Sequence, residues 1–143
     1  LAAAAEAVGV ARSLLETTVA YVSERRQFGR PVGANQAVKH SCVDVAIAVE
    51  FARPVVAMAA WSMAKGRSPT DGGTVSGDVS MAKALASDAV DQACRSALQC
   101  HGAIGYTIEH DLQLWLKRGW ALSATWGDAA HHRRRLAQLL GLG

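Results

Sequence analysis

Residues 23–40 read SERRQFGRPVGANQAVKH and gather several polar and aromatic side chains around one bend. Arg25 and Arg26 end an apolar helical pattern, and Phe28 and Gln36 stand on either side of a Gly-Arg-Pro stretch. A guanidinium group carries a fork of donors that matches phosphate oxygens, so the bend predicts a site for a phosphate-bearing small molecule. Charge compensation at a helix C-terminus, worth about 0.3–1 kcal/mol, is the alternative; it explains the arginines but not Phe28 and Gln36.

A second candidate stretch, QCHGAIGYTIE, spans residues 99–109. Its glycines do not form a dinucleotide-binding fingerprint, because no strand is predicted before them. The five histidines lack the spacing of metal ligands, so no metal site is predicted. No serine–histidine–acid arrangement has a recognisable context either.

The elements that must position these residues are helices. Apolar residues recur at spacings of three and four over residues 1–24, 34–65, 75–100 and 109–124. Pro54 predicts a kink or a lost hydrogen bond in the second helix, and GRSPTDGGT at 66–74 predicts a loop. Asp128 is a suitable N-cap for a short last helix that ends near Leu140. The sequence therefore predicts an all-α fold, an antiparallel four-helix-type bundle with a short extra C-terminal helix.

Composition excludes several classes of protein. Half of the residues are hydrophobic, but no apolar run approaches the ~20 residues of a membrane-spanning helix. The net charge of +3 comes without aromatic platforms or a reading helix, which argues against nucleic acid. Cys42, Cys94 and Cys100 lie on apolar helix faces and predict free, buried thiols in a reducing cytoplasm.

Together the two stretches resemble the acyl-CoA dehydrogenase family. The first motif is Y-x-x-x-R-x-Q-F-G-x-P-x-x-x-x-Q-A-V-K-H, from Tyr21 to His40, and the second is Q-C-H-G-A-I-G-Y-T-I-E, followed by a WGD. They stand in the family's order, on the expected helix boundaries. The resemblance covers residues 1–143 and identifies them as the C-terminal helical bundle domain. It implies that the family's N-terminal helical and middle β domains are absent from this sequence, which begins at Leu1 within a helical pattern and is expected to be a fragment.

The resemblance implies that the domain contacts FAD bound by a neighbouring subunit. Arg25 would reach the diphosphate, Gln27 and Phe28 would line the same end of the cofactor, and Gln36 would bond to it from the second helix. Gln99 and the backbone near Gly102 would approach from the second motif. The family usually has two glycines where this chain has Gly102-Ala103.

The resemblance also implies that no catalytic residue stands at the usual position. In the commonest branch a glutamate before the last helix abstracts the acyl α-proton, and Trp126 occupies that position here. The next threonine of that branch, which helps to bind the cofactor, corresponds to Asp128, a helix cap that is not expected to act as the base. Glu109 matches a structural glutamate. Other branches carry the base on the first helix of this domain, at a position upstream of Leu1.

We therefore expect a domain of an FAD-dependent enzyme that desaturates an acyl-CoA thioester between its α and β carbons. The domain would supply FAD contacts and the oligomer interface of a tetramer, either of identical subunits or with a partner that carries the base, as in bacterial degradation of steroid side chains. The fragment alone is expected to be inactive. The alternative is a catalytically silent assembly subunit. A small-residue stripe along 82–97 predicts tight helix packing.

Overall fold

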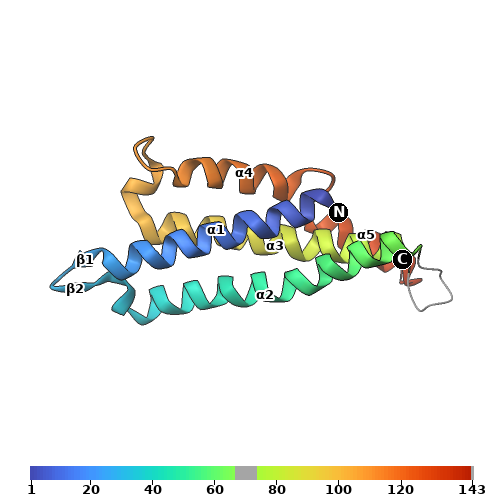
Figure 1. Ribbon diagram of the computed structural model, residues 1–143, viewed down its shortest axis with the longest axis horizontal. Coiled ribbons are helices and arrows are strands. Elements are labelled where there is room, and N and C mark those ends of the chain that lie inside the picture. The colour runs from blue at the N-terminus through green and yellow to red at the C-terminus, as the bar shows by residue number, and fades with distance from the viewer. Residues whose placement is uncertain (67–73, 143) are drawn as a thin grey trace.

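The computed structural model describes residues 1–66 and 74–142 and consists almost entirely of helices (Figure 1). The long helices are α1 (Ala2–Glu24), α2 (Gln36–Lys65), α3 (Val75–His101) and α4 (Leu112–Ala124), followed by a short α5 (Ala129–Leu139). Short 3₁₀ segments η1 (Val32–Ala34) and η3 (Gly102–Tyr106) precede α2 and follow α3. The predicted all-α bundle with an extra C-terminal helix is confirmed.

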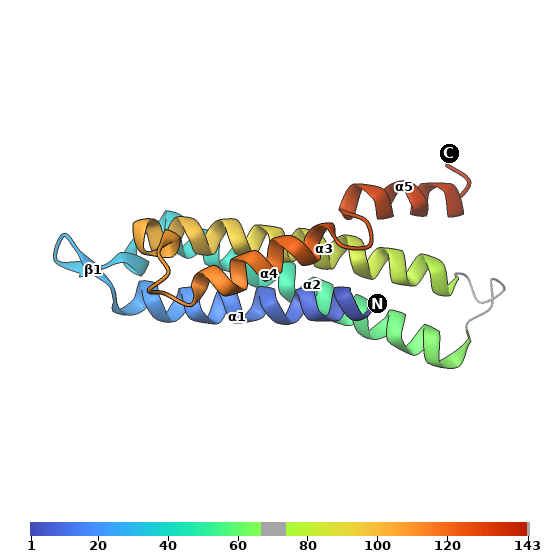
Figure 2. The ribbon, with the colours of Figure 1, turned by 90° about the horizontal axis from the view of Figure 1, so that it is seen from above.

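Successive long helices run antiparallel, and α5 lies beside one end of α3 (Figures 1 and 2). α3 packs against all four other helices, because its inner face carries small side chains that let neighbouring backbones approach closely. The buried alanines of this face are Ala82, Ala86, Ala89, Ala93 and Ala97. The stripe predicted to pack tightly is therefore covered by the chain's own helices.

The bend between α1 and α2 is a small β-hairpin, which the sequence did not predict. Strand β1 (Arg26–Gln27) pairs antiparallel with β2 (Arg30–Pro31), and Gln27 lies opposite Arg30. Phe28 and Gly29 make the two-residue turn with φ angles of 50° and 79°. Two positive φ angles are typical of the tight turns that match the twist of a hairpin. The hairpin projects from one end of the bundle (Figure 1).

Helix boundaries follow the sequence with a few shifts. α2 begins at Gln36 after η1 and continues through Pro54 without interruption, so the proline removes one helical donor but does not end the helix. α4 begins at Leu112 and not at residue 109. Asp128 caps α5 as predicted, since its Oδ1 accepts from the His131 N–H at 2.7 Å. Of the predicted loop 66–74, only Gly66 and Thr74 belong to the described residues.

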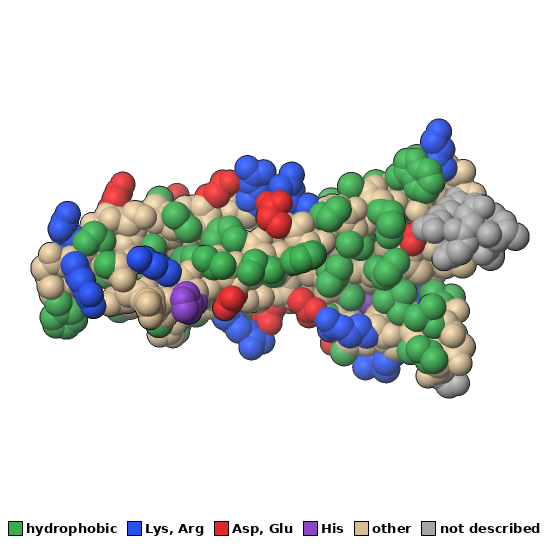
Figure 3. All heavy atoms as spheres, turned by 90° about the horizontal axis from the view of Figure 1, so that it is seen from below, with side chains coloured by type: hydrophobic (Ala, Val, Ile, Leu, Met, Phe, Trp, Pro, Cys, Tyr) green, Lys and Arg blue, Asp and Glu red, His purple; other side chains and the backbone are tan. Residues whose placement is uncertain are grey.

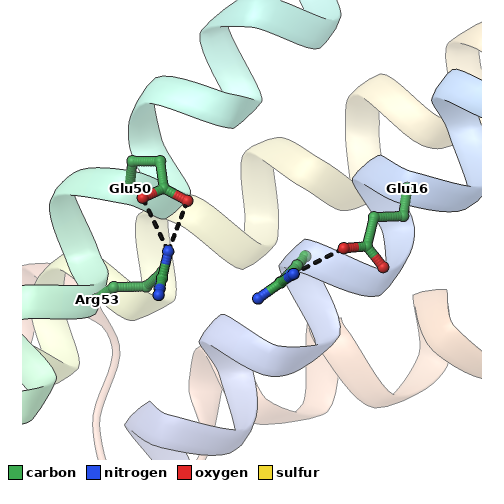
Figure 4. Close-up of polar contacts among 4 residues, drawn as sticks. Glu16, Glu50 and Arg53 are labelled. Carbon is green, nitrogen blue, oxygen red and sulfur yellow. Dashed lines mark hydrogen bonds and ion pairs between the residues drawn. The ribbon is translucent and has the colours of Figure 1, made fainter.

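Several ion pairs lie on the outer faces of the helices. The close-up in Figure 4 shows the exposed Glu50–Arg53 pair of α2 (2.9 Å) and Glu16, which pairs with Arg12 at 2.8 Å within α1. The Glu6 carboxylate accepts hydrogen bonds from Arg118 Nε at 2.6 Å and Nη2 at 2.7 Å, and this pair links α1 to α4. Exposed pairs of this kind contribute at most about 1 kcal/mol each, so burial of the apolar faces dominates the stability.

None of the described helices combines the length and the apolar character that crossing a membrane requires.

Candidate cofactor-binding site

A pocket of about 640 Å³ lies at the hairpin end of the bundle, where the two sequence motifs meet. Arg25 and Gln27 line it from the end of α1 and from β1, and Gln99 and Gly102 line it from the end of α3 and from η3. The start of α2 closes a third side with Ala37, Val38 and Ser41. Four of the six predicted cofactor-binding residues thus share one pocket, although they come from motifs about seventy residues apart in the sequence.

The backbone of Arg25 forms two hydrogen bonds, whereas its guanidinium group forms none with the described residues. Its N–H donates to the Tyr21 carbonyl at 2.9 Å, and its own carbonyl accepts from the Val32 N–H at 2.8 Å. Within residues 1–66 and 74–142, its side chain forms no hydrogen bond or ion pair. An exposed arginine with five uncommitted donors beside a pocket can bind two oxygens of a phosphate group.

Phe28 and Gln36, the other two predicted residues, do not line this pocket. Phe28 stands at the hairpin tip with its ring completely exposed. Gln36 is the first residue of α2 and is also exposed. The hairpin is tied to this helix start by Arg30, whose Nη2 donates to Asn35 Oδ1 at 2.7 Å. Both side chains are therefore exposed at the same end of the molecule, where a ligand or another chain can contact them.

Gly102 ends α3 with a φ angle of 60°. A Cβ added there would meet nothing within 4 Å, so it would point into open space. The backbone at Gly102 is thus accessible to a ligand in the pocket, and the conformation itself favours glycine.

Tyr21 and His101 form an aromatic wall that the sequence prediction did not single out. Their rings stack with centroids 4.3 Å apart, and the His110 ring meets His101 edge-on at 5.1 Å. His101 is buried, and its Nδ1 lies 2.8 Å from the Ala97 carbonyl. Burial lowers the pKa of His101, opposed by its bond to Ala97, so the ring is neutral near pH 7. The positions of Tyr21 and His101 within the two motifs were the only sequence signal for this wall.

The predicted base position lies at the other end of α4. Trp126 follows α4 in a turn, with a φ angle of 62°, and its indole is 83% exposed. Asp128 accepts a backbone hydrogen bond from His131, and this bond lowers the pKa of the carboxyl group. Asp128 is thus an ionised helix cap, as expected. α4 has 13 residues and so separates this turn from the pocket by about 20 Å.

The described residues contain no group of three or more histidine, cysteine or acidic side chains placed to hold a metal ion.

Comparison with known families decides the identity of the fold. The family model described as acyl-CoA dehydrogenase, C-terminal domain, matches residues 1–141. The chain belongs to the acyl-CoA dehydrogenase family. The resemblance seen in the two motifs is confirmed, as is the assignment to the C-terminal helical part.

Individual relatives and solved structures extend the comparison. Acyl-CoA dehydrogenase FadE34 of Mycobacterium tuberculosis is 37% identical over 140 residues, which are 98% of this chain and 19% of FadE34. The ChsE4–ChsE5 complex of the same organism superposes with a TM-score of 0.89 and 27% identity over 99% of this chain and 37% of that one. The FAD complex of PigA gives a TM-score of 0.85 and 28% identity over 97% of this chain and 35% of PigA. The chain therefore spans well under half the length of these proteins.

Proposed function

We propose that this chain is part of an FAD-dependent acyl-CoA dehydrogenase and that its hairpin-end pocket contacts the FAD of a neighbouring subunit. The observation that carries the proposal is the free guanidinium of Arg25 in one pocket with Gln27, Gln99 and Gly102. The FAD complex of PigA, a structural neighbour, supports the choice of cofactor.

The residues present fit such a cofactor. The Arg25 fork matches two oxygens of a diphosphate, and the amides of Gln27 and Gln99 can donate to or accept from its neighbouring polar groups. Open space at Gly102 leaves room for close approach. When bound, FAD supplies the acceptor for the hydride that leaves the β-carbon of an acyl-CoA thioester. The chain's own contribution is to bind and orient the cofactor.

Phe28 and Gln36 belong to the same proposal as contacts across the subunit boundary. A fully exposed phenylalanine at a hairpin tip loses favourable burial unless another surface covers it. We assign Phe28 to the FAD-binding surface formed with the neighbouring subunit, and Gln36 to a hydrogen bond with the cofactor from the start of α2.

In this proposal the catalytic base comes from outside the turn between α4 and α5. An indole cannot accept the acyl α-proton, and Asp128 already caps α5, so neither Trp126 nor Asp128 takes that role. We propose a heteromeric tetramer in which the partner subunit supplies the base. The ChsE4–ChsE5 complex among the structural neighbours supports such an assembly. Three free thiols, at Cys42, Cys94 and Cys100, support a cytoplasmic location for it.

The test uses the full-length subunit, purified alone and together with an acyl-CoA dehydrogenase encoded beside it. We expect visible flavin absorbance that bleaches on addition of an acyl-CoA only when both subunits are present. Bleaching by the subunit alone would place the base elsewhere in this same polypeptide. Absence of FAD from the complex would contradict the cofactor proposal.

A catalytically silent assembly subunit is the second candidate, and it too would use the large hydrophobic surface that the described residues leave exposed. Along α2, a stripe of large hydrophobic side chains is exposed at helical spacing: Val43, Ile47, Phe51, Met58 and Trp61. Figure 3 shows the molecule from the side of α2, with hydrophobic side chains gathered along this face. Such a stripe is typical of an oligomer interface. A silent subunit would tolerate replacement of Arg25 without loss of flavin, which separates the two functions.

A further inference from the structure

The largest fully buried side chain in the described chain belongs to a lysine that neither motif contains. Lys83 lies in the first half of α3 and is 2% exposed. Lysine is rarely buried unless its charge is paired or hydrogen-bonded, because its desolvation is costly. A lysine at this depth therefore calls for an account of its partners.

The ammonium group of Lys83 finds three acceptors. Its Nζ donates to Ser87 Oγ at 2.6 Å, to the Gly127 carbonyl at 2.9 Å and to the Ser123 carbonyl at 3.2 Å. An ammonium group has three donors, so its hydrogen-bonding capacity is filled. The Ser123 carbonyl belongs to the last turn of α4, where helical partners are missing and the negative end of the helix dipole favours a cation. Lys83 thus ties the end of α4 and Gly127 to the first half of α3.

A second side chain holds the same turn. His132 Nε2 lies 3.1 Å from the Trp126 carbonyl, which can only accept, so Nε2 carries the proton. His132 is buried, and burial lowers its pKa, with the positive charge of Lys83 contributing in the same direction. A neutral His132 therefore fixes the Trp126 carbonyl, and Lys83 fixes the Gly127 carbonyl.

The turn needs this support because its backbone is strained. Trp126 and Gly127 have φ angles of 62° and 96°. A non-glycine residue in the left-handed region costs on the order of 1 kcal/mol. A Cβ at Gly127 would lie 2.5 Å from His131 Cδ2, so glycine is required at that position. The resulting conformation directs the Trp126 indole outward.

We propose that Lys83 is a positioning residue: by holding the 126–127 turn it sets the orientation of the side chain at position 126, which corresponds to the position of the acyl α-proton base in the commonest branch of the family and so would border the acyl-CoA. The clamp, made of the Lys83 bonds to the Ser123 and Gly127 carbonyls, is a contact within this chain. Only its link to acyl-CoA rests on the proposed function. In this chain the clamp fixes the backbone beside an outward-facing indole, and the proposal gives that indole the role of a wall beside the acyl group. Loss of the clamp should loosen the turn and weaken acyl-CoA binding while the FAD pocket, at the far end of α4, stays intact.

The experiment compares Lys83→Met with Val49→Ala in the full-length assembly. Methionine keeps most of the apolar stem of lysine but donates no hydrogen bond, whereas Val49 is buried in α2. Hydrogen–deuterium exchange followed by mass spectrometry reads the segment 123–132. We expect K83M to raise exchange in that segment about tenfold, because charge-assisted hydrogen bonds are lost. V49A should lower the melting temperature without this local change.

Steady-state kinetics of the same variants tests the link to the substrate. We expect K83M to raise KM for the acyl-CoA about tenfold at unchanged FAD content, and V49A to leave KM unchanged. Unchanged exchange in 123–132 would overturn the clamp. Faster exchange with an unchanged KM would overturn only its connection to the acyl-CoA site, so this failure is distinguishable from a failure to bind FAD. Should K83M not fold, Lys83→Gln, which keeps a buried donor without the charge, is judged by the same criteria.

Discussion

Arg25 differs from most arginines of this chain because its guanidinium group has no partner among the described residues. Most of the arginines with described partners form ion pairs with acids, as Arg118 does with Glu6. Arg25 instead has a fixed backbone and a free guanidinium beside a pocket. That contrast makes it the best single test of the cofactor site.

Replacement of Arg25 by alanine should weaken FAD binding in the assembled protein about 10- to 100-fold, the effect of losing one or two charge-assisted hydrogen bonds of about 1.5–3 kcal/mol in total. Arg25→Lys should recover only part of the affinity, because an ammonium group cannot form the bidentate contact. Arg26→Ala is the matched control, since Arg26 is the next residue in the sequence but does not line the pocket. Titration of the apoprotein with FAD measures all three. Equal losses for R25A and R26A would contradict the assignment.

Two buried histidines predict a pH dependence of stability. Burial lowers the pKa of both His101 and His132, so the unfolded chain binds protons more readily than the folded chain. Their contribution to stability is therefore complete above the unfolded pKa, about 6.5, and is lost as the pH falls below it. Each histidine protonated only in the unfolded state costs about 1.4 kcal/mol per pH unit.

We expect the urea concentration at the unfolding midpoint to be lower at about pH 5.5 than at about pH 7.5, one unit to either side of the unfolded pKa. His101→Phe, which keeps an aromatic ring against Tyr21, should reduce this dependence. His40→Gln, at an exposed position of α2, should not. A midpoint that is independent of pH in the unaltered protein would show that neither histidine stays neutral on folding.

At the scale of elements, helix packing distinguishes two glycines that look alike in the sequence. Gly9 in α1 is exposed, and an added Cβ would meet nothing within 4 Å. Gly119 in α4 is buried, and an added Cβ would lie 2.5 Å from Cys94 Sγ and 3.1 Å from Val90 Cγ2 on α3. Gly119 therefore sets how closely α4 can approach α3.

The same substitution should thus have opposite effects at the two sites. Gly9→Ala should stabilise the protein by about 0.5–1 kcal/mol, because alanine is the better helix former. Gly119→Ala should destabilise it by about 1–3 kcal/mol, because the core must shift to admit a methyl group. Denaturant unfolding of the two variants measures both. Stabilisation by G119A would show that α3 and α4 are not packed as closely as described.

Much of the element order could be predicted from local rules. Apolar residues at spacings of three and four gave the helices, and Asp128 was recognisable as a cap. The hairpin was not predicted, because Phe28 occupies a left-handed turn position that usually carries asparagine, aspartate or glycine. The late start of α4 depends on His110 Nδ1, which accepts from the Leu112 N–H at 3.0 Å, a contact that no helical periodicity encodes.

Site residues that belong to the two sequence motifs could be predicted, and residues placed only by packing could not. Arg25, Gln27, Gln99 and Gly102 were selected from the two motifs and share a pocket. Lys83 was missed because a single lysine among alanines reads as a surface residue. Its partners are carbonyls of a turn forty and forty-four residues further along the chain. Only tertiary structure reveals such contacts.

At the scale of the whole molecule, the bundle buries one set of apolar faces and leaves another exposed. The stripe of small residues on α3 is used inside the chain, so it cannot serve an oligomer interface. The exposed stripe on α2 has no such internal partner among the described residues, since Phe51 is 70% exposed and Ile47 49% exposed. If the chain assembles as we propose, α2 is the surface that another subunit covers.

A charge placed on that stripe should therefore prevent assembly without unfolding the bundle. In the full-length protein, Ile47→Glu should shift sedimentation from the oligomer to smaller species, because burying an unpaired carboxylate at an interface costs several kcal/mol. Ala20→Glu, on the exposed face of α1, adds the same charge away from the stripe and should leave the oligomer unchanged. Circular dichroism should show equal helix content in both variants. Since the proposed FAD site is shared between subunits, I47E should also lose FAD, whereas A20E should retain it. An I47E protein that stays oligomeric and keeps its flavin would remove α2 from the interface and leave its hydrophobic stripe without that explanation.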